Sequence, residues 1–370
     1  IFPFIYELKH RKPSISIEVW CPDRITLTDI KKNNFLYDQA SQVVSFFVLK
    51  DFDKNFKLHK YLILFKLIFR IIFISISCFI GNVTFIHFKL LNNWPFRLLY
   101  FFNIKRTFFA ESGGGGFGYT KMMNDLDQGK KNSKFTKLKI NPGNLLIFNK
   151  SSLNQSLSNF KNNKIINFGV PKLRKTWIKN INLNSEIYIK NELSKYGYEY
   201  PSLIISVLLG YFGGLPHQIS SNIQLKLLRD VFDVVKDINK NIILMLKPHV
   251  ITDLNVLHDL IKLYPKLNII ITYLHPMVMA SHSKFVIAND YTTALCDFKI
   301  MGVPTIEYAA YTDEALYITE GGSIRPEYIN HFINNDKKLL KATINNIIDS
   351  KIKANKIEYN NSSIIFDEII

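Results

Sequence analysis

Short apolar runs alternate with helix-like segments along the first half of the chain. The strand-like runs are residues 14–21, 43–52, 82–89, 106–112, 144–150 and 164–169. Strands that alternate with helices at this spacing predict parallel βαβ units. The segment after Pro3 predicts a helix with no strand before it. We therefore expect this chain to be a piece of a longer reading frame that lacks the first strand of its domain.

After a polar crossover, the second half repeats the pattern more regularly. Its strand-like runs are residues 202–210, 241–246, 268–274, 284–289 and 304–308, the last of which closes the series. Each run is almost continuously apolar, which is typical of strands with helices on both faces of their sheet. The predicted fold is α/β, with two Rossmann-like doubly wound domains that face a cleft. We place the domains at 1–175 and 200–335, followed by a C-terminal helix and tail at 336–370.

Residues 61–80 form a long apolar segment that Lys66 and Arg70 interrupt. The uninterrupted part is shorter than the roughly 18 residues that a membrane-spanning helix needs. The two cations lie four residues apart, on one face of a helix. The pattern favours a buried domain helix with a solvated edge, and the alternative is a helix that lies in a membrane surface.

The chain has 47 Lys and Arg against 30 Asp and Glu, which gives a net charge of +17. Such a surplus favours an anionic partner, which includes nucleic acid, acidic lipid and charged small substrates. The sequence has no basic helix with interleaved aromatic residues and no zinc-finger spacing, so we expect no nucleic-acid partner. Its 3 cysteines are scattered. That usage indicates a reducing, cytoplasmic compartment and no metal site.

Unusual polar side chains follow the predicted strands of the second half. They are Lys247, His249, His275, Asp290, Thr292 and Thr293. Three adjacent parallel strands would bring them to one edge of the sheet, where ligands of doubly wound domains bind. Two hydroxyls at a helix start form a phosphate site. The alternative is an ordinary helix cap made by Asp290 or Thr292.

The histidines, a glycine loop and one glutamate complete the candidate site. His275 precedes Pro276, and His249 follows a proline, so both have a stiffened backbone. A histidine in this position can donate a hydrogen bond or a proton to a leaving phosphate, although a structural role is the commoner alternative. Gly213 belongs to a loop that allows close backbone approach to a ligand. Glu307 ends the last strand, where it either accepts hydrogen bonds from a ribose or is solvated.

The run from KPHV through YLHP and NDYTT to GVPTIEY resembles the donor half of GT-B glycosyltransferases that build bacterial surface polysaccharides. In pattern it is similar to capsular polysialyltransferases and lipooligosaccharide sialyltransferases. The resemblance covers the His275-Pro276 motif and the hydroxyl pair Thr292 and Thr293. ESGGGGFGY resembles the acidic motif of their N-terminal half, with Glu111 at the first acidic position. Ser112 stands where a second carboxylate is usual.

This resemblance implies a metal-independent glycosyltransferase of capsule or lipopolysaccharide synthesis. The donor would be a nucleotide-sugar, such as a CMP-sialic acid-like molecule, used as a substrate with no cofactor. The acceptor would be a glycan or glycolipid at the inner face of the cytoplasmic membrane. Glu111 would be the base, or else Asp125 or Asp127 beyond the glycine loop. His275 would assist the leaving phosphate, and Thr292 and Thr293, together with Lys247, would help to stabilise its charge.

The glycines at 113–116 follow a predicted strand, so we interpret them as a loop that closes over the acceptor. The alternative for this loop is a flexible linker. Two other functions stay open. Teichoic-acid glycerophosphotransferases have a helix start similar to NDYTT, which allows transfer of a polyol phosphate from a CDP-polyol. The missing second acid also allows a non-catalytic homologue that serves as a scaffold.

Overall fold

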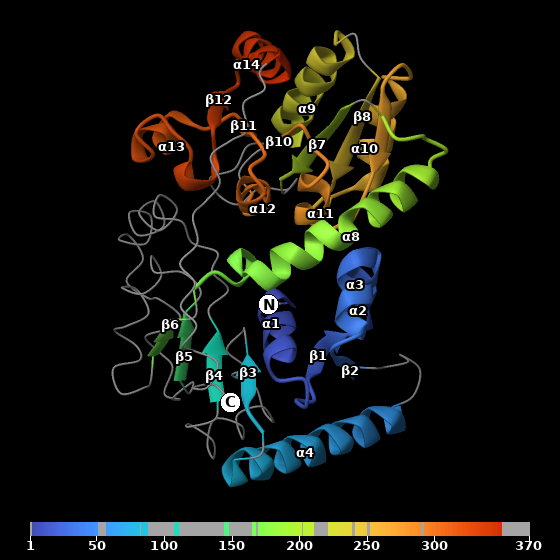
Figure 1. Cartoon of the computed structure of the whole chain (residues 1–370), viewed down its shortest axis with the longest axis vertical. Helices are drawn as coiled ribbons and strands as arrows, with labels where there is room; N and C mark the ends of the chain where they lie inside the picture. Colours follow the sequence, from blue (N-terminus) through green and yellow to red (C-terminus); the bar gives the residue numbers. More distant parts are fainter. Residues whose placement is uncertain are drawn as a thin grey trace.

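The computed structural model describes residues 2–50, 57–81, 83–87, 107–110, 144–147, 165–167, 169–201, 203–210, 221–238, 241–249, 252–289 and 292–349. Within them, every strand pairing is parallel, and the strands form three sheets. Two of the sheets lie in the N-terminal half and the third in the C-terminal half (Figure 1). The predicted α/β class, with parallel sheets in two halves, is confirmed.

The N-terminal half contains a two-stranded and a four-stranded sheet, in the orders β1-β2 and β3-β4-β5-β6. Its strands are β1 (Glu18–Asp23), β2 (Ser45–Lys50), β3 (Phe85–His87), β4 (Thr107–Ala110), β5 (Asn144–Ile147) and β6 (Ile165–Asn167). Its described helices are α1 (Phe2–Arg11), α2 (Arg24–Lys32), α3 (Asn34–Ser41) and α4 (Lys57–Ile80). Side-chain caps position two short helices that the sequence pattern did not predict. Asp23 accepts a hydrogen bond from the Thr26 N–H of α2, and Asn33 accepts one from the Leu36 N–H of α3.

Helix α4 covers residues 57–80 and so contains the apolar segment predicted at 61–80, but its outer face differs from the prediction. Ile71, Ser75 and Cys78 lie on a buried face, whereas Phe69 and Phe73 are exposed. Lys66 is exposed, as expected for the solvated edge, but most of the exposed face is apolar. Among the residues that the structure describes, no helix is long and apolar enough to cross a membrane.

The C-terminal sheet has the order β12-β11-β10-β7-β8-β9. Its strands are β7 (Leu203–Leu209), β8 (Ile242–Lys247), β9 (Asn268–Ile271), β10 (Phe285–Asn289), β11 (Thr305–Ala309) and β12 (His331–Asn334). Counted along the chain, this is the 3-2-1-4-5-6 order of a Rossmann domain. The prediction that the strand at 304–308 closes the series is wrong, because β12 pairs with β11 at the edge.

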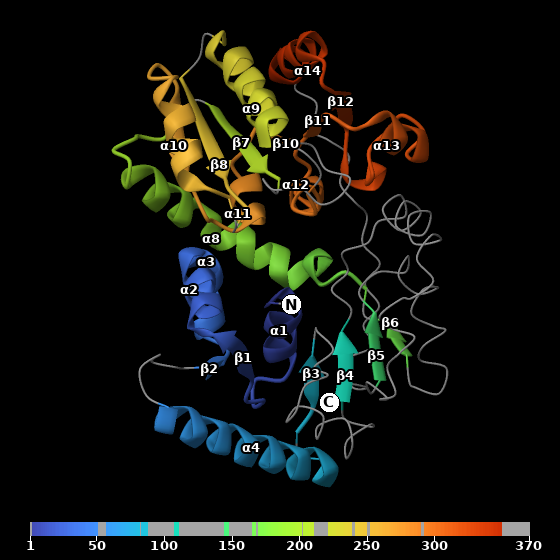
Figure 2. The ribbon, with the colours of Figure 1, turned by 180° about the vertical axis from the view of Figure 1, so that it is seen from behind.

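Helices cover both faces of this sheet. The described helices of this half are α8 (Lys175–Ser194), α9 (Ser221–Lys236), α10 (Leu254–Lys262), α11 (Pro276–Ala280), α12 (Leu295–Ile300), α13 (Asp313–Ile318) and α14 (Lys337–Asp349). Side chains of α9, α10 and α14 pack on one face, and those of α8, α11 and α12 on the other. Figures 1 and 2 both place α8 between this sheet and helices α1 to α3. Phe35 of α3 and Trp177 of α8 belong to the second of these cores.

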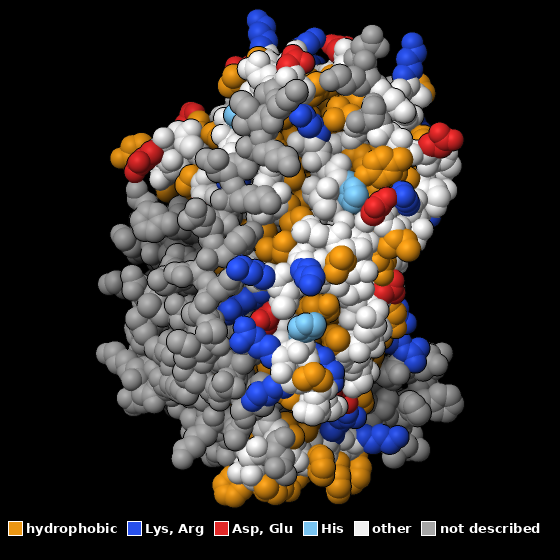
Figure 3. Space-filling view, viewed as in Figure 1, with side chains coloured by type: hydrophobic (Ala, Val, Ile, Leu, Met, Phe, Trp, Pro, Cys, Tyr) orange, Lys and Arg blue, Asp and Glu red, His pale blue; other side chains and the backbone are white. Residues whose placement is uncertain are grey.

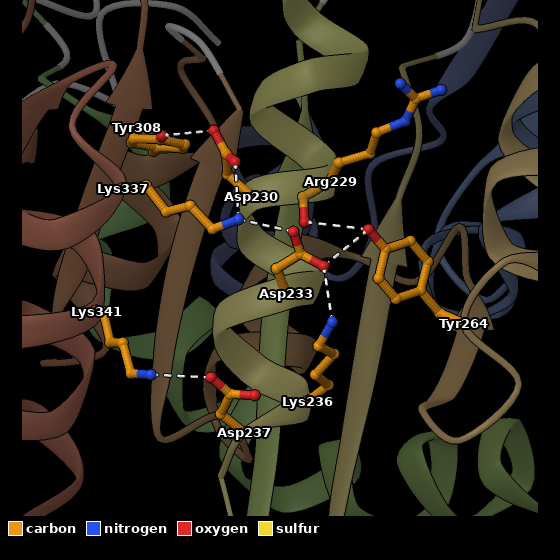
Figure 4. Close-up of polar contacts among 9 residues, drawn as sticks. All are labelled: Arg229, Asp230, Asp233, Lys236, Asp237, Tyr264, Tyr308, Lys337 and Lys341. Carbon is orange, nitrogen blue, oxygen red and sulfur yellow. Dashed lines mark hydrogen bonds and ion pairs between the residues drawn. The ribbon is translucent and has the colours of Figure 1, made fainter.

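Ion pairs connect helix α14 to α9 and to the residue that follows it (Figure 4). The Lys337 Nζ lies 3.2 Å from an Asp230 carboxylate oxygen and 2.7 Å from one of Asp233. Lys341 pairs with Asp237 at 2.8 Å, and the Tyr308 hydroxyl of β11 donates to Asp230 at 3.0 Å. Leu340 and other apolar residues of α14 also lie in the core. The helix that follows residue 336 is thus packed into the C-terminal half.

Candidate functional site

The candidate site lies along the carboxyl edge of the C-terminal sheet. Lys247 ends β8 beside Leu208 of β7, and Asn289 ends β10 beside Leu209. Strands β7 and β10 are the neighbours at which the winding of the sheet reverses, and ligands of such sheets bind outside this point. The prediction that three adjacent strands carry the site is wrong, because β7 lies between β8 and β10. The groups after β8 and β10 are therefore about 10 Å apart.

Lys247 is a poorly solvated cation at this edge. Its Nζ donates a hydrogen bond to the Tyr273 carbonyl oxygen at 3.4 Å and lies 6.0 Å from the centre of the Tyr273 ring. Burial lowers the pKa of Lys247 from its ordinary 10.5 to about 8, although the Asp297 carboxylate partly opposes the shift. Desolvation disfavours the charged form of an amine. A bound anion would restore the stabilisation that water no longer provides.

His275 follows β9 and caps helix α11. Its Nδ1 accepts a hydrogen bond from the Met277 N–H at 3.2 Å, and Pro276 occupies the first helical turn. The imidazole is 8% exposed and packs against the rings of Trp177 and Phe35, at centroid distances of 5.6 and 6.1 Å. His275 therefore has a structural role as a helix cap and a packing residue, which was the alternative considered from the sequence.

The protonation of His275 follows from these contacts. Burial, and then the charges of Lys172 and Lys247, hold the pKa of His275 well below its ordinary 6.5. The ring is thus neutral near pH 7. Because Nδ1 accepts a hydrogen bond, the single ring proton belongs to Nε2. In this state His275 can donate a hydrogen bond to an anion, but it does not supply a positive charge.

An ion pair between a partly exposed lysine and a buried carboxylate lies next to these two residues, and the sequence did not predict it. The Lys172 Nζ is 2.9 Å from the Asp297 carboxylate of α12, which is 2% exposed. Burial raises the pKa of Asp297, and Lys172 counteracts that shift. Lys172 belongs to a short 3-10 turn at Pro171–Leu173, just before α8. The only sequence signal was a carboxylate within the apolar helix at 295–300, because its partner is 125 positions away.

The residues that follow β8 and β10 are closer to solvent. The Thr292 hydroxyl oxygen accepts a hydrogen bond from the Ala294 N–H at 3.3 Å, and Thr293 is exposed. Thr292 thus closes the turn before α12, close to the capping role considered as its alternative. His249 is exposed, and desolvation followed by the charge of Lys247 lowers its pKa.

Glu307 is fully buried in β11, so the alternative of a solvated glutamate is wrong. Its carboxylate accepts hydrogen bonds from the Tyr311 hydroxyl and the Ser323 hydroxyl, each at 2.5 Å. A ribose that approached Glu307 would meet a carboxylate with these two donors already in place. Ribose binding by Glu307 stays a prediction.

Asn289 is a further candidate that the sequence analysis passed over in favour of its neighbour. Its side chain is fully buried where β10 meets β7, and its Nδ2 donates to the Gln224 carbonyl oxygen at 2.9 Å. Its Oδ1 accepts no hydrogen bond from any residue that the structure describes. A buried amide oxygen of this kind favours a donor group on a ligand or on a bound water.

Several predicted site residues lie outside the described ranges. They are Glu111, Gly213 and Asp290, together with Ser112, the glycines at 113–116, Asp125 and Asp127. Their roles stay predictions.

In the described part of the chain, no group of three or more His, Cys, Asp or Glu side chains is arranged to hold a metal ion. A cavity of about 220 Å³ lies between α3 and α8. Its lining includes Asp38, Glu192 and Leu274 but none of the predicted site residues.

Neither a family model nor a curated protein sequence matches this chain. Among solved structures, a glycosyltransferase from Rickettsia africae is 12% identical, with a TM-score of 0.47 over 94% of this chain and 83% of that one. TcCGT1 in complex with UDP is 13% identical, with a TM-score of 0.47 over 95% and 88%. The wall teichoic acid polymerase TagF is 12% identical, with a TM-score of 0.39 over 75% and 76%. These scores are too low to support an activity, so the fold assignment rests on the strand order.

Proposed function

We propose that the chain is a GT-B-type glycosyltransferase that moves a sugar from a nucleotide-activated donor to a surface glycan. One observation carries the proposal. The carboxyl edge of a sheet with Rossmann order holds a desolvated lysine, Lys247, beside a neutral histidine, His275. A desolvated cation with an adjacent hydrogen-bond donor stabilises the charge that develops on a leaving phosphate.

In the proposed reaction, an acceptor hydroxyl attacks the anomeric carbon while the bond to the nucleotide phosphate breaks. The Lys247 ammonium neutralises the departing phosphate, and the His275 Nε2–H donates a hydrogen bond to it. Thr292 and Thr293 supply further hydroxyls at the same edge. Glu111 takes the proton of the acceptor hydroxyl. No metal ion or cofactor enters this scheme.

The resemblance in sequence extends the proposal to a donor and a place in the cell. The donor is a CMP-sialic acid-like sugar, and the acceptor is a glycan or glycolipid of capsule or lipopolysaccharide synthesis. The chain works in the cytoplasm, peripherally on the inner face of the cytoplasmic membrane. The strongly basic composition, with a net charge of +17, suits an anionic donor, acceptor or lipid surface.

The test compares wild type with His275→Asn and Lys247→Met. Asparagine is a good helix N-cap, so the first substitution preserves the cap of α11 and removes the imidazole. We expect each variant to keep its cooperative unfolding transition and to lose at least 100-fold in kcat with a CMP-sugar donor. Normal turnover by folded His275→Asn would remove His275 from the mechanism. A phosphodiester product from a CDP-polyol would replace the reaction with polyol phosphate transfer.

A further inference from the structure

Helix α4 presents a continuous apolar face to solvent. The large hydrophobic side chains exposed along it are Tyr61, Leu64, Phe65, Phe69, Ile72, Phe73, Ile76, Phe79 and Ile80. Most of them recur at spacings of three, four and seven residues, which places them on one side of a helix. Figure 3 shows hydrophobic side chains gathered along the lower end of the molecule, where Figure 1 places α4.

This face is large for a protein surface. Its five aromatic side chains are between 63% and 79% exposed. With about 200 Å² for each ring, they alone present about 700 Å² to solvent. The largest apolar patch of an ordinary monomer covers about 300–600 Å² and is often functional. A face of this size is typical of a surface that a partner covers.

The opposite side of α4 packs against the rest of the protein, so the exposed face points toward solvent. Ile71 and Cys78 are buried. The Arg70 guanidinium forms an ion pair with Glu18 of β1 and lies 3.7 Å from the centre of the Phe47 ring of β2. These contacts anchor the middle of the helix beside the two-stranded sheet. The aromatic face thus points outward as a preformed surface.

The charge of this region selects the kind of partner. Residues 57–80 contain Lys57, Lys60, Lys66 and Arg70 but no Asp or Glu, and Lys66 is exposed. A second copy of the chain, packed face to face on α4, would bring the two exposed Lys66 side chains toward each other and add the repulsion of two chains of net charge +17. Anionic lipid headgroups have the opposite charge, and acyl chains accept the aromatic rings.

We propose that α4 lies in the surface of an anionic lipid bilayer, with its aromatic face at the acyl boundary and Lys66 at the lipid phosphates. A helix with one apolar face and basic flanks binds at this depth, about 5–10 Å below the headgroup surface. The inference gives the membrane association proposed above a specific surface. It rests on that association but not on the transfer reaction.

The test uses the full chain and vesicles of phosphatidylcholine, with or without 30% phosphatidylglycerol, in a sedimentation assay. We expect binding to the anionic vesicles that weakens as salt is raised. Phe69→Gln with Phe73→Gln replaces two exposed rings of α4 and should reduce the partition coefficient at least tenfold. Leu183→Gln with Ile187→Gln is the matched control, because these exposed apolar residues lie four apart on α8. This pair should bind as wild type does.

Three results would overturn the inference. The first is that the wild-type protein does not bind anionic vesicles. The second is that the α8 double variant loses as much vesicle binding as the α4 double variant. The third is that the α4 double variant is folded and still binds vesicles as wild type does. A concentration-dependent dimer that only the α4 substitutions dissociate would assign the face to a second copy instead. Nucleotide binding measured on the same variants separates the two proposals. If the α4 pair loses vesicle binding but retains nucleotide binding, the lipid surface stands whatever reaction the site performs.

Discussion

Replacing Lys247 by methionine should stabilise the protein at neutral pH. The pKa of Lys247 falls from 10.5 to about 8 on folding. At 1.36 kcal/mol for each pKa unit, keeping this amine charged in the folded state costs about 3 kcal/mol at pH 7. Methionine has a similar length and no charge, but it loses the hydrogen bond to the Tyr273 carbonyl, which contributes about 1 kcal/mol. The net gain in the free energy of unfolding is about 2 kcal/mol.

The pH dependence gives this prediction a second signature. Between pH 8 and 10.5 the unfolded wild type binds more protons at Lys247 than the folded protein, so wild-type stability rises with pH. The advantage of Lys247→Met should therefore shrink across that interval. Urea unfolding of both proteins, monitored by circular dichroism at several pH values, measures the difference. Lys266→Met, at an exposed position, is the control and should change little. A variant less stable than wild type at pH 7, or a difference that is independent of pH, would refute the reasoning.

Two other substitutions test the buried polar groups around the site. Lys172→Met leaves the Asp297 carboxylate without the cation at 2.9 Å and should reduce the free energy of unfolding by about 3–5 kcal/mol. A carboxyl with a raised pKa binds its proton more tightly in the folded state than in the unfolded state. The free energy of unfolding of this variant should therefore recover as the pH falls from 7 to 5. Chemical denaturation at both pH values measures this recovery. Ser323→Ala removes a hydrogen bond to the buried Glu307 and should reduce the free energy of unfolding by about 2 kcal/mol in the same assay. An unchanged unfolding midpoint would contradict this role for the serine.

The sequence predicts most strands of the C-terminal half because each is buried on both faces and reads as an apolar run. The apolar pattern does not predict β12 because its four residues, HFIN, are half polar and lie at the edge of the sheet. Helices α2 and α3 are short and depend on caps at Asp23 and Asn33. Such caps are visible in a sequence only when the helix itself is already suspected.

The candidate site is predictable in part for a similar reason. The position of Lys247 follows from the end of β8, because parallel strands end at a common edge. The insertion of β7 between β8 and β10 does not follow from the spacing of the strands along the chain. The pairing of Lys172 with Asp297 and the packing of His275 against Phe35 and Trp177 arise only when distant segments meet. These contacts set the protonation of His275 and Lys247, so the chemistry of the site depends on tertiary structure.

The measurement that tests the central claim most directly is nucleotide binding at the carboxyl edge of the C-terminal sheet. Isothermal titration of wild type and Lys247→Met with CMP, CDP, UDP, GDP and their sugars compares donors and locates the site together. We expect CMP and CMP-sugars to bind wild type selectively and to bind Lys247→Met at least tenfold more weakly. Equal binding by both proteins would place the nucleotide elsewhere. Binding of no nucleotide by folded wild type would contradict the proposed transferase.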